Sequence, residues 1–197
     1  MLSAAVCLRA LVPIQERFDA FLVCCFSNRP PISAFRKELE QPVVGIMEAA
    51  LYASRMCGGK LGVITTSVRS EILHAQSIIE YGLGDFSAGC AASEVSVLGL
   101  EREPRERVYA EVIRAAKVLV NERGADCICL GCAGMTGMRE ACEDAAGTAA
   151  RQVMVVDGVA VGVQLLIALV REGLGTAKRG AYRPAEPARL ARKQDWY

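Results

Sequence analysis

Two cysteines, Cys25 and Cys132, are the strongest candidates for chemistry in this 197-residue sequence. Each ends a similar segment, in which an aspartate (Asp19 or Asp126) is followed by mainly apolar residues and, six positions later, by the cysteine. Short apolar runs that are spaced by helical patterns are typical of buried parallel strands. Because reactive groups in open α/β sheets collect at the carboxyl ends of strands, both thiols are predicted to lie at such ends.

The residues after each cysteine favour a turn, and they are Phe26-Ser27-Asn28 and Ala133-Gly134-Met135. Backbone N–H groups in such turns could bind a carboxylate or an imide oxygen, and a helix N-terminus there would lower the pKa of the thiol. Two thiols on opposite sides of a carbon acid suit one reaction in particular. One thiolate removes a proton while the opposite thiol delivers a proton to the other face. The pair therefore predicts inversion at carbon without metal, flavin or pyridoxal phosphate, and neither a cofactor nor a metal site is expected.

Other cysteines have structural interpretations. Cys24 alternates with Cys25 along the predicted strand, so its side chain is expected to point to the opposite face and into the core. Cys127 and Cys129 are expected in the interior of a strand. Cys129 and Cys132 also form a CxxC pattern, for which a zinc site or a thioredoxin-like redox pair remains an open alternative.

A few further polar residues stand at informative positions. His74 is the single histidine, which excludes HExxH metalloproteases, and it is expected on the exposed face of a helix together with Glu71. Thr65-Thr66 ends a predicted strand, and it is either an N-cap pair for the next helix or a pair of hydroxyl donors to a ligand. Glu48 and Asp157 each close a strand, and capping of the following helix explains them at least as well as an acid or base role.

The elements that would position these residues follow from hydrophobic periodicity. Strands are expected at 19–24, 42–46, 61–65, 94–98, 126–130 and 152–156. Helices are expected at 3–17, 31–40, 48–57, 70–81, 106–123, 136–147 and 159–172. The segment from Gly173 onward is expected to be a loop or a short docked extension.

The two cysteine segments, and the similar apolar runs downstream of them, indicate an internal duplication. The predicted fold is α/β, with two similar lobes whose parallel sheets are flanked by helices and are related by a pseudo-twofold axis. The expected lobes are 1–57 with 159–197, and 58–158, with the two thiols facing each other across a cleft. By the repeat count, the first lobe lacks its opening strand and about 45 residues. The exposed sheet edge predicts a homo-oligomer, and catalysis weaker than that of an extended form.

Four motifs resemble the hydantoin racemase branch of the aspartate/glutamate racemase superfamily, and they lie at 18–27, 41–49, 62–66 and 130–135. The resemblance implies two α/β lobes, cofactor-independent racemisation of 5-substituted hydantoins or allantoin, and frequent oligomers. It implies that Cys25 and Cys132 are the catalytic pair. The ring-binding contacts that it implies are Ser27, Asn28, Thr65, Thr66, Ala133 and Gly134, with Asn28 standing where the family commonly has Asp. Two alternatives stay open: a weak or inactive homologue that only binds the ligand, and a decarboxylase or isomerase of the same superfamily.

Composition limits the partners and the location. Lys and Arg number 23 and Asp and Glu number 22, so the net charge of +1 provides no basic field for nucleic acid or for an acidic membrane. The longest apolar stretch, 153–170, contains Asp157 and Gln164 and is not expected to span a membrane. Nine cysteines, most of them in apolar runs, are expected to be reduced thiols of a cytoplasmic protein. The expected partners are a small-molecule substrate and a second copy of the chain.

Overall fold

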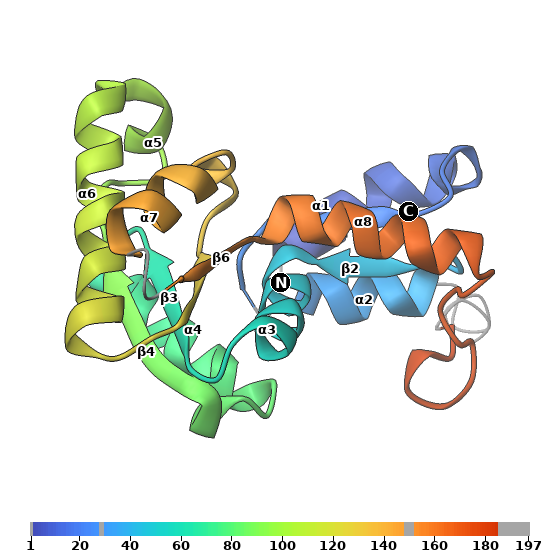
Figure 1. Cartoon of the computed structure of the whole chain (residues 1–197). Coiled ribbons are helices and arrows are strands. Elements are labelled where there is room, and N and C mark those ends of the chain that lie inside the picture. The colour runs from blue at the N-terminus through green and yellow to red at the C-terminus, as the bar shows by residue number, and fades with distance from the viewer. Residues whose placement is uncertain (1, 28–29, 148–151, 185–197) are drawn as a thin grey trace. The chain divides into compact units, whose positions relative to one another are not determined.

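The computed structural model describes residues 2–27, 30–147 and 152–184. The chain divides into two compact units, and each is described by itself (Figure 1). Unit 1 comprises Met1–Val23, Arg29–Gly45 and Val163–Tyr197, and unit 2 comprises Cys24–Asn28 and Ile46–Gly162. The lobe boundaries expected from the duplication stay a prediction.

Unit 1 is built on two short parallel strands, β1 (Phe21–Val23) and β2 (Val43–Gly45). Helix α1 (Leu2–Leu11), a 3-10 turn (Val12–Arg17) and helix α2 (Pro30–Glu38) accompany them, and α2 begins at two prolines as N-terminal preferences favour. Their buried core consists of Leu8, Ile32, Phe35, Leu39 and Val43.

The segment after Gly173 docks onto unit 1, as the sequence predicted. The Thr176 hydroxyl donates to Gln41 O at 3.0 Å, and Lys178 Nζ donates to Arg36 O at 2.8 Å. A short 3-10 turn (Gly180–Tyr182) follows. These hydrogen bonds hold the extension against the end of α2 and the loop that leads into β2.

Unit 2 contains a four-stranded parallel sheet in the order β4-β3-β5-β6. The strands are β3 (Leu61–Thr65), β4 (Ser87–Ala92), β5 (Cys127–Leu130) and β6 (Met154–Asp157). Every residue of the two central strands is buried, which is why both are continuous apolar runs in the sequence. The predicted α/β fold with parallel sheets is confirmed.

Helices cover both faces of this sheet (Figure 1). The helices of unit 2 are α3 (Ile46–Cys57), α4 (Val68–Glu80), α5 (Gly99–Arg102), α6 (Arg105–Lys117) and α7 (Arg139–Ala146), with a π-helical turn (Val118–Glu122) and a 3-10 turn (Gly84–Phe86). Helix α8 (Gly158–Arg171) begins directly after β6 and continues from Val163 as part of unit 1. Helices α6 and α7 share a buried cluster with Ile128 and Leu130 of β5. Helix α3 lies on the opposite face, where Ser54 Oγ is 3.0 Å from Cys129 Sγ.

The prediction of a strand at 94–98 is wrong. The strand that pairs with β3 at the edge of the sheet lies earlier in the chain and is β4. Its sequence, Ser-Ala-Gly-Cys-Ala-Ala, has no β-branched residue and no alternation, so it carries little strand signal. The residues at 94–98 instead form a turn, in which Glu94 has a φ of 61° and Val95 N donates to Ser93 Oγ at 3.4 Å.

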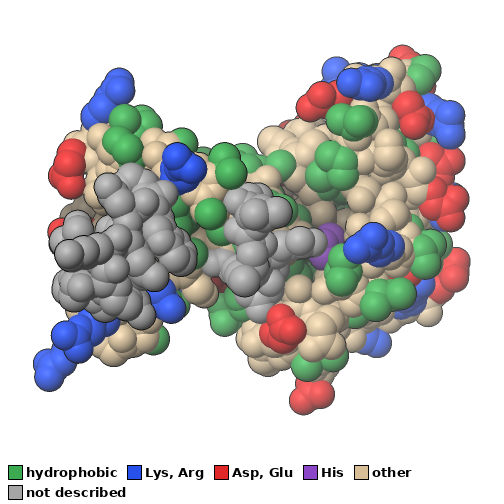
Figure 2. Space-filling view, turned by 180° about the vertical axis from the view of Figure 1, so that it is seen from behind, with side chains coloured by type: hydrophobic (Ala, Val, Ile, Leu, Met, Phe, Trp, Pro, Cys, Tyr) green, Lys and Arg blue, Asp and Glu red, His purple; other side chains and the backbone are tan. Residues whose placement is uncertain are grey.

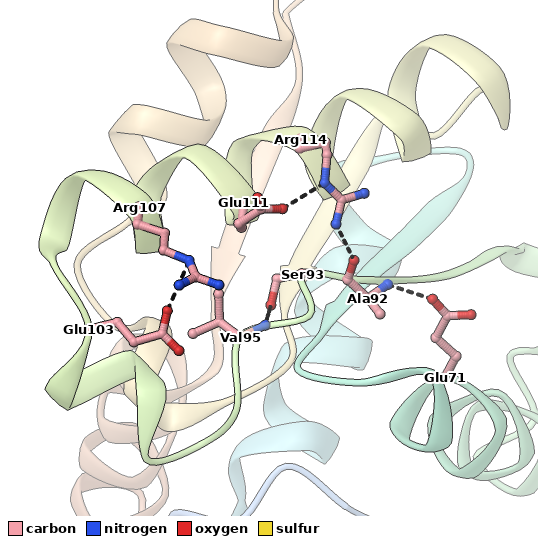
Figure 3. Close-up of polar contacts among 8 residues, drawn as sticks. All are labelled: Glu71, Ala92, Ser93, Val95, Glu103, Arg107, Glu111 and Arg114. Atoms are coloured by element: carbon pink, nitrogen blue, oxygen red, sulfur yellow. Dashed lines mark hydrogen bonds and ion pairs between the residues drawn. The ribbon is translucent and has the colours of Figure 1, made fainter.

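Strand β4 is an edge strand, and side chains from neighbouring elements form hydrogen bonds with its backbone N–H and C=O groups (Figure 3). Glu71 accepts a hydrogen bond from Ala92 N at 2.5 Å, and Arg114, which pairs with Glu111 at 2.7 Å, donates to Ala92 O at 3.2 Å. Arg123 Nη1 donates to Cys90 O at 2.5 Å. Helix α4, helix α6 and the π-helical turn after α6 are thereby fastened to the edge of the sheet.

Buried thiols make the stability of the fold sensitive to alkaline pH. Burial, mainly, raises the pKa of Cys90 to about 12 and that of Cys142 to about 11. In the unfolded chain each of these thiols has the ordinary cysteine pKa of about 8.5, so each releases about one proton near that pH. Their stabilising contribution is thus complete below about pH 8.5 and is lost as the pH rises towards 11–12.

We therefore expect the denaturation midpoint in urea to fall steadily between pH 8.5 and 11. The Cys142→Ala variant should show a shallower fall than the parent chain, because it lacks one of the protons that folding retains. A midpoint that stays constant up to pH 11 would contradict this prediction.

Among the described residues, no helix has both the length and the apolar character that crossing a bilayer requires. On the face shown in Figure 2, acidic and basic side chains are interspersed rather than gathered by sign, in line with the net charge of +1.

Candidate functional site

Cys132 lies directly beyond the carboxyl end of β5. Gly131 follows the strand and donates its N–H to Ile64 O of β3 at 2.8 Å. A Cβ atom at position 131 would overlap this carbonyl oxygen, so only glycine allows so close an approach. Cys132 itself is extended (φ −155°, ψ 141°) and is followed by a 3-10 turn, Ala133–Met135. The sheet and the turn together fix the direction of the thiol.

The surroundings of Cys132 raise the pKa of its thiol. Burial is the largest cause, a hydrogen bond from the backbone of Gly134 acts in the opposite direction, and the negative charge of a Cys25 thiolate raises the pKa further. The structure thus places Cys25 near enough to Cys132 for a charge on the first thiol to affect the pKa of the second. Both belong to unit 2.

Cys25 lies in a turn beyond β1. Its side chain is exposed, with Sγ 3.3 Å from Ser27 Oγ, and Ser27 N donates to Cys25 O at 2.9 Å. Phe26 between them is buried. Asn28, the remaining predicted contact of this turn, lies outside the described residues.

The expectation that Cys24 belongs to the core is wrong, because its side chain is exposed. Strand β1 ends at Val23, so the alternation of a strand no longer applies at position 24. Cys127 and Cys129 are buried in β5, as predicted. Among the residues that the structure describes, no group of three or more His, Cys, Asp or Glu side chains converges on a common metal position.

Thr65 and Thr66 stand at the carboxyl end of β3, next to the end of β5, and both are buried. The interpretation as an N-cap pair is wrong. Ser67 is the N-cap of α4, with its hydroxyl accepting from Ser70 N at 3.2 Å, while Thr65 Oγ1 donates to Ser67 O at 3.1 Å. The threonines therefore sit at the same edge of the sheet as Cys132, together with half-buried Ala133 and exposed Gly134.

Asp157 caps α8, which confirms its capping interpretation. Its Oδ1 accepts from Val159 N at 2.9 Å and from Ala160 N at 3.3 Å. The same carboxylate accepts from the Thr136 hydroxyl and from Gly137 N, each at 3.3 Å. It thus links the segment after Cys132 to the end of β6. Glu48, in contrast, lies within the first turn of α3.

We expect Asp157→Ala to lower the free energy of unfolding by about 1–2 kcal/mol, the usual cost of losing an N-cap. The variant should also raise deuterium uptake in peptides that cover residues 133–138, because Gly137 loses an acceptor. Glu140→Ala, on the exposed side of α7, serves as the control. A loss below 0.5 kcal/mol (about the lower limit for a cap) would show that the carboxylate is dispensable.

His74 differs from its predicted surface position. It is only 9% exposed, because α4 turns His74, Ser77 and Ile78 towards the interior. Its imidazole packs on Phe26, with the ring centroids 5.3 Å apart and the planes tilted by 59°. The spacing of three and four residues places His74, Ser77 and Ile78 on one helix face, but only Ile78 is apolar, so the sequence signal for a buried face is weak.

Comparisons with known proteins point in one direction. The sequence model of a family described as Asp/Glu/Hydantoin racemase matches residues 2–166. An uncharacterized protein from Schizosaccharomyces pombe is 40% identical over 181 residues, which are 91% of this chain and 75% of that protein. A hydantoin racemase from Rhizobium meliloti is 34% identical over 166 residues, which are 83% of this chain and 65% of that enzyme. The structure of an allantoin racemase from Klebsiella pneumoniae superposes with a TM-score of 0.79 at 30% identity, covering 92% of this chain and 71% of that one.

Proposed function

Because the chain belongs to the Asp/Glu/hydantoin racemase family and is therefore an isomerase of the racemase type, we propose that it inverts the stereocentre of a 5-substituted hydantoin or of allantoin. Cys25 and Cys132 are the proton-transfer pair in this proposal. The observation that carries it is the placement of the two thiols in unit 2, each at the start of a turn, with Cys25 near enough that a negative charge on it raises the pKa of Cys132.

The reaction balances with two thiols alone. One cysteine, as thiolate, removes the proton from C5 of the ring, and the electron pair of the broken C–H bond moves onto the neighbouring C4 carbonyl as an enolate. The opposite thiol gives its proton to the other face of C5. The two cysteines end with exchanged protonation states, and each enantiomer is processed from its own side.

The ring-binding contacts are the residues around the two thiols. Ser27 lies beside Cys25, the buried Thr65 and Thr66 end β3, and Ala133 and Gly134 start the turn after Cys132. The hydroxyls of Ser27 and Thr66 and the backbone N–H of Ala133 can donate to the imide and enolate oxygens, which carry the developing charge, while Thr65 and Gly134 shape the site. Asn28 completes the proposed set.

Optical measurements test this function directly. An enantiopure hydantoin or allantoin, incubated with the protein and a chelator, should lose its circular dichroism signal while its mass stays unchanged. A loss of carbon dioxide from an arylmalonate would indicate a decarboxylase instead. Binding without turnover across hydantoins, allantoin, aspartate and glutamate would favour a ligand-binding homologue and contradict the proposal.

The raised pKa of Cys132 predicts the pH dependence of racemisation. Turnover requires that exactly one of the two thiols holds a proton, so kcat/KM should be bell-shaped. Burial makes Cys132 keep its proton to higher pH than an exposed thiol, so the falling limb should lie above about pH 8.5. Both enantiomers should give the same kcat/KM profile, because the equilibrium constant of racemisation is one. A falling limb below pH 8 (about half a unit under the ordinary thiol value) would refute this assignment.

A further inference from the structure

Among its described residues, the turn that carries Cys25 has one buried side chain, that of Phe26. Phe26 is 6% exposed, although its neighbour Cys25 is exposed and Ser27 is half-buried. Strand β1 ends at Val23, so strand pairing does not extend to the cysteine. The position of Cys25 therefore depends on where the ring of Phe26 is seated.

His74 forms part of that seat. Its imidazole lies 5.3 Å from the Phe26 ring between centroids, which is within the distance range of packed aromatic pairs, and the ring planes are tilted by 59°. His74 is itself held by α4, whose start is fixed by the Ser67 cap beside Thr65 and Thr66. The contact thus connects the first cysteine to the strand end that bears the proposed ring-binding threonines.

Cys132 is held by different means. The Gly131 hydrogen bond to Ile64, the 3-10 turn at 133–135 and the Asp157 contacts to Thr136 and Gly137 determine its place. None of these involves His74. A disturbance at His74 should therefore reach one thiol and spare the other.

We propose that His74 is a positioning residue for Cys25: by packing on Phe26 it holds the first thiol in line with the substrate carbon, while Cys132 is positioned independently of it. The inference rests on the proposed two-thiol function. Its chemical basis is the steep dependence of proton transfer on geometry, since a displacement of about 1 Å can cost about 10²-fold in rate.

Hydrogen-exchange measurements on variants that keep only one of the two proposed catalytic cysteines separate the contributions of the two thiols. In deuterated water, Cys132→Ser should still exchange the C5 hydrogen of one enantiomer through Cys25, and Cys25→Ser that of the other through Cys132. Adding His74→Ala should slow the Cys25-dependent exchange by about 10-fold or more, and should change the Cys132-dependent exchange by less than about 2-fold. His74→Phe, which keeps an aromatic ring against Phe26, should retain most of the Cys25-dependent rate.

Two further variants complete the design. Phe26→Ala should reproduce the effect of His74→Ala, and the double variant should lose no more than either one alone, as expected for residues that act through one contact. Ser77→Ala is the matched control, because Ser77 is also buried on α4 and its hydroxyl donates within the helix, to Leu73 O at 3.0 Å. It should leave both exchange rates unchanged.

A second readout does not depend on turnover. In the intact enzyme, Ser27 N is bonded to Cys25 O at 2.9 Å, so its amide should be protected from deuterium exchange. His74→Ala should raise deuterium uptake in peptides covering 24–27, and Ser77→Ala should not. Equal slowing of both thiol-dependent exchanges, or unchanged uptake at 24–27, would overturn the positioning role. If this uptake rises but no substrate is ever exchanged, the proposed racemisation fails while the structural link between His74 and the turn stands.

Discussion

Cys25→Ser and Cys132→Ser are each expected to reduce racemisation by about 10²-fold or more, the range for removing a positioned acid or base. Serine fits the same space, but its hydroxyl holds its proton far too tightly to serve as a base near neutral pH. Each variant loses either the group that accepts the proton or the group that returns it to the opposite face. Time courses of circular dichroism from both pure enantiomers provide the measurement.

Cys24→Ser is the matched control for this pair of variants. Cys24 is adjacent in sequence and equally exposed, yet it has no place in the proposed transfer. Its variant should racemise at the rate of the parent chain. If Cys24→Ser were inactive while Cys25→Ser kept its activity, the assignment of the first thiol would be wrong.

Gly131→Ala should damage both stability and activity. A methyl group at position 131 would overlap the Ile64 carbonyl, which belongs to the rigid centre of the sheet and cannot yield. Overpacking of this kind costs about 1–3 kcal/mol in the free energy of unfolding. Because Cys132 is the next residue, the displacement should also lower kcat, with about 10-fold or more as the expected loss.

Urea denaturation and racemisation assays on the same preparation test this expectation. Gly84→Ala is a suitable control, since its new Cβ would meet the flexible Ile79 side chain at 3.3 Å. The control should change the denaturation midpoint little and the rate not at all. A Gly131→Ala enzyme with the parent's stability would show that the β3–β5 contact has room to adjust.

The sequence carries much of the fold because the central strands are buried on both faces. Continuous apolar runs mark β3 at 61–65 and β5 near 126–130, and the structure has them at Leu61–Thr65 and Cys127–Leu130. Edge strand β4 escaped prediction because its small residues include no β-branched or large apolar side chain and leave no periodic pattern. Its polar contacts come from Glu71 and Arg114, which are distant in sequence and show no local signal.

The positions of the site residues could be predicted from the sequence where they follow from local patterns such as repeated spacing. The two cysteine turns follow from repeated spacing, and in the structure a charge on Cys25 raises the pKa of Cys132. Cys24 was misplaced because β1 ends at Val23, one residue before the predicted end of the strand. His74 was misplaced because a histidine on a mixed helix face gives no sign of what lies beneath it, and Phe26 is 48 positions earlier in the chain.

The occupied backbone groups of β4 also bear on how the protein behaves at high concentration. An unprotected outer strand is a template on which strands of other molecules can grow, as in amyloid. Here an incoming strand that approached Ala92 would first have to displace the Glu71 carboxylate and the Arg114 guanidinium, and one that approached Cys90 would meet Arg123. The β4 edge is therefore protected against the addition of a strand from another molecule. Copies of the chain that associate are expected to do so through side-chain contacts rather than by strand pairing at this edge.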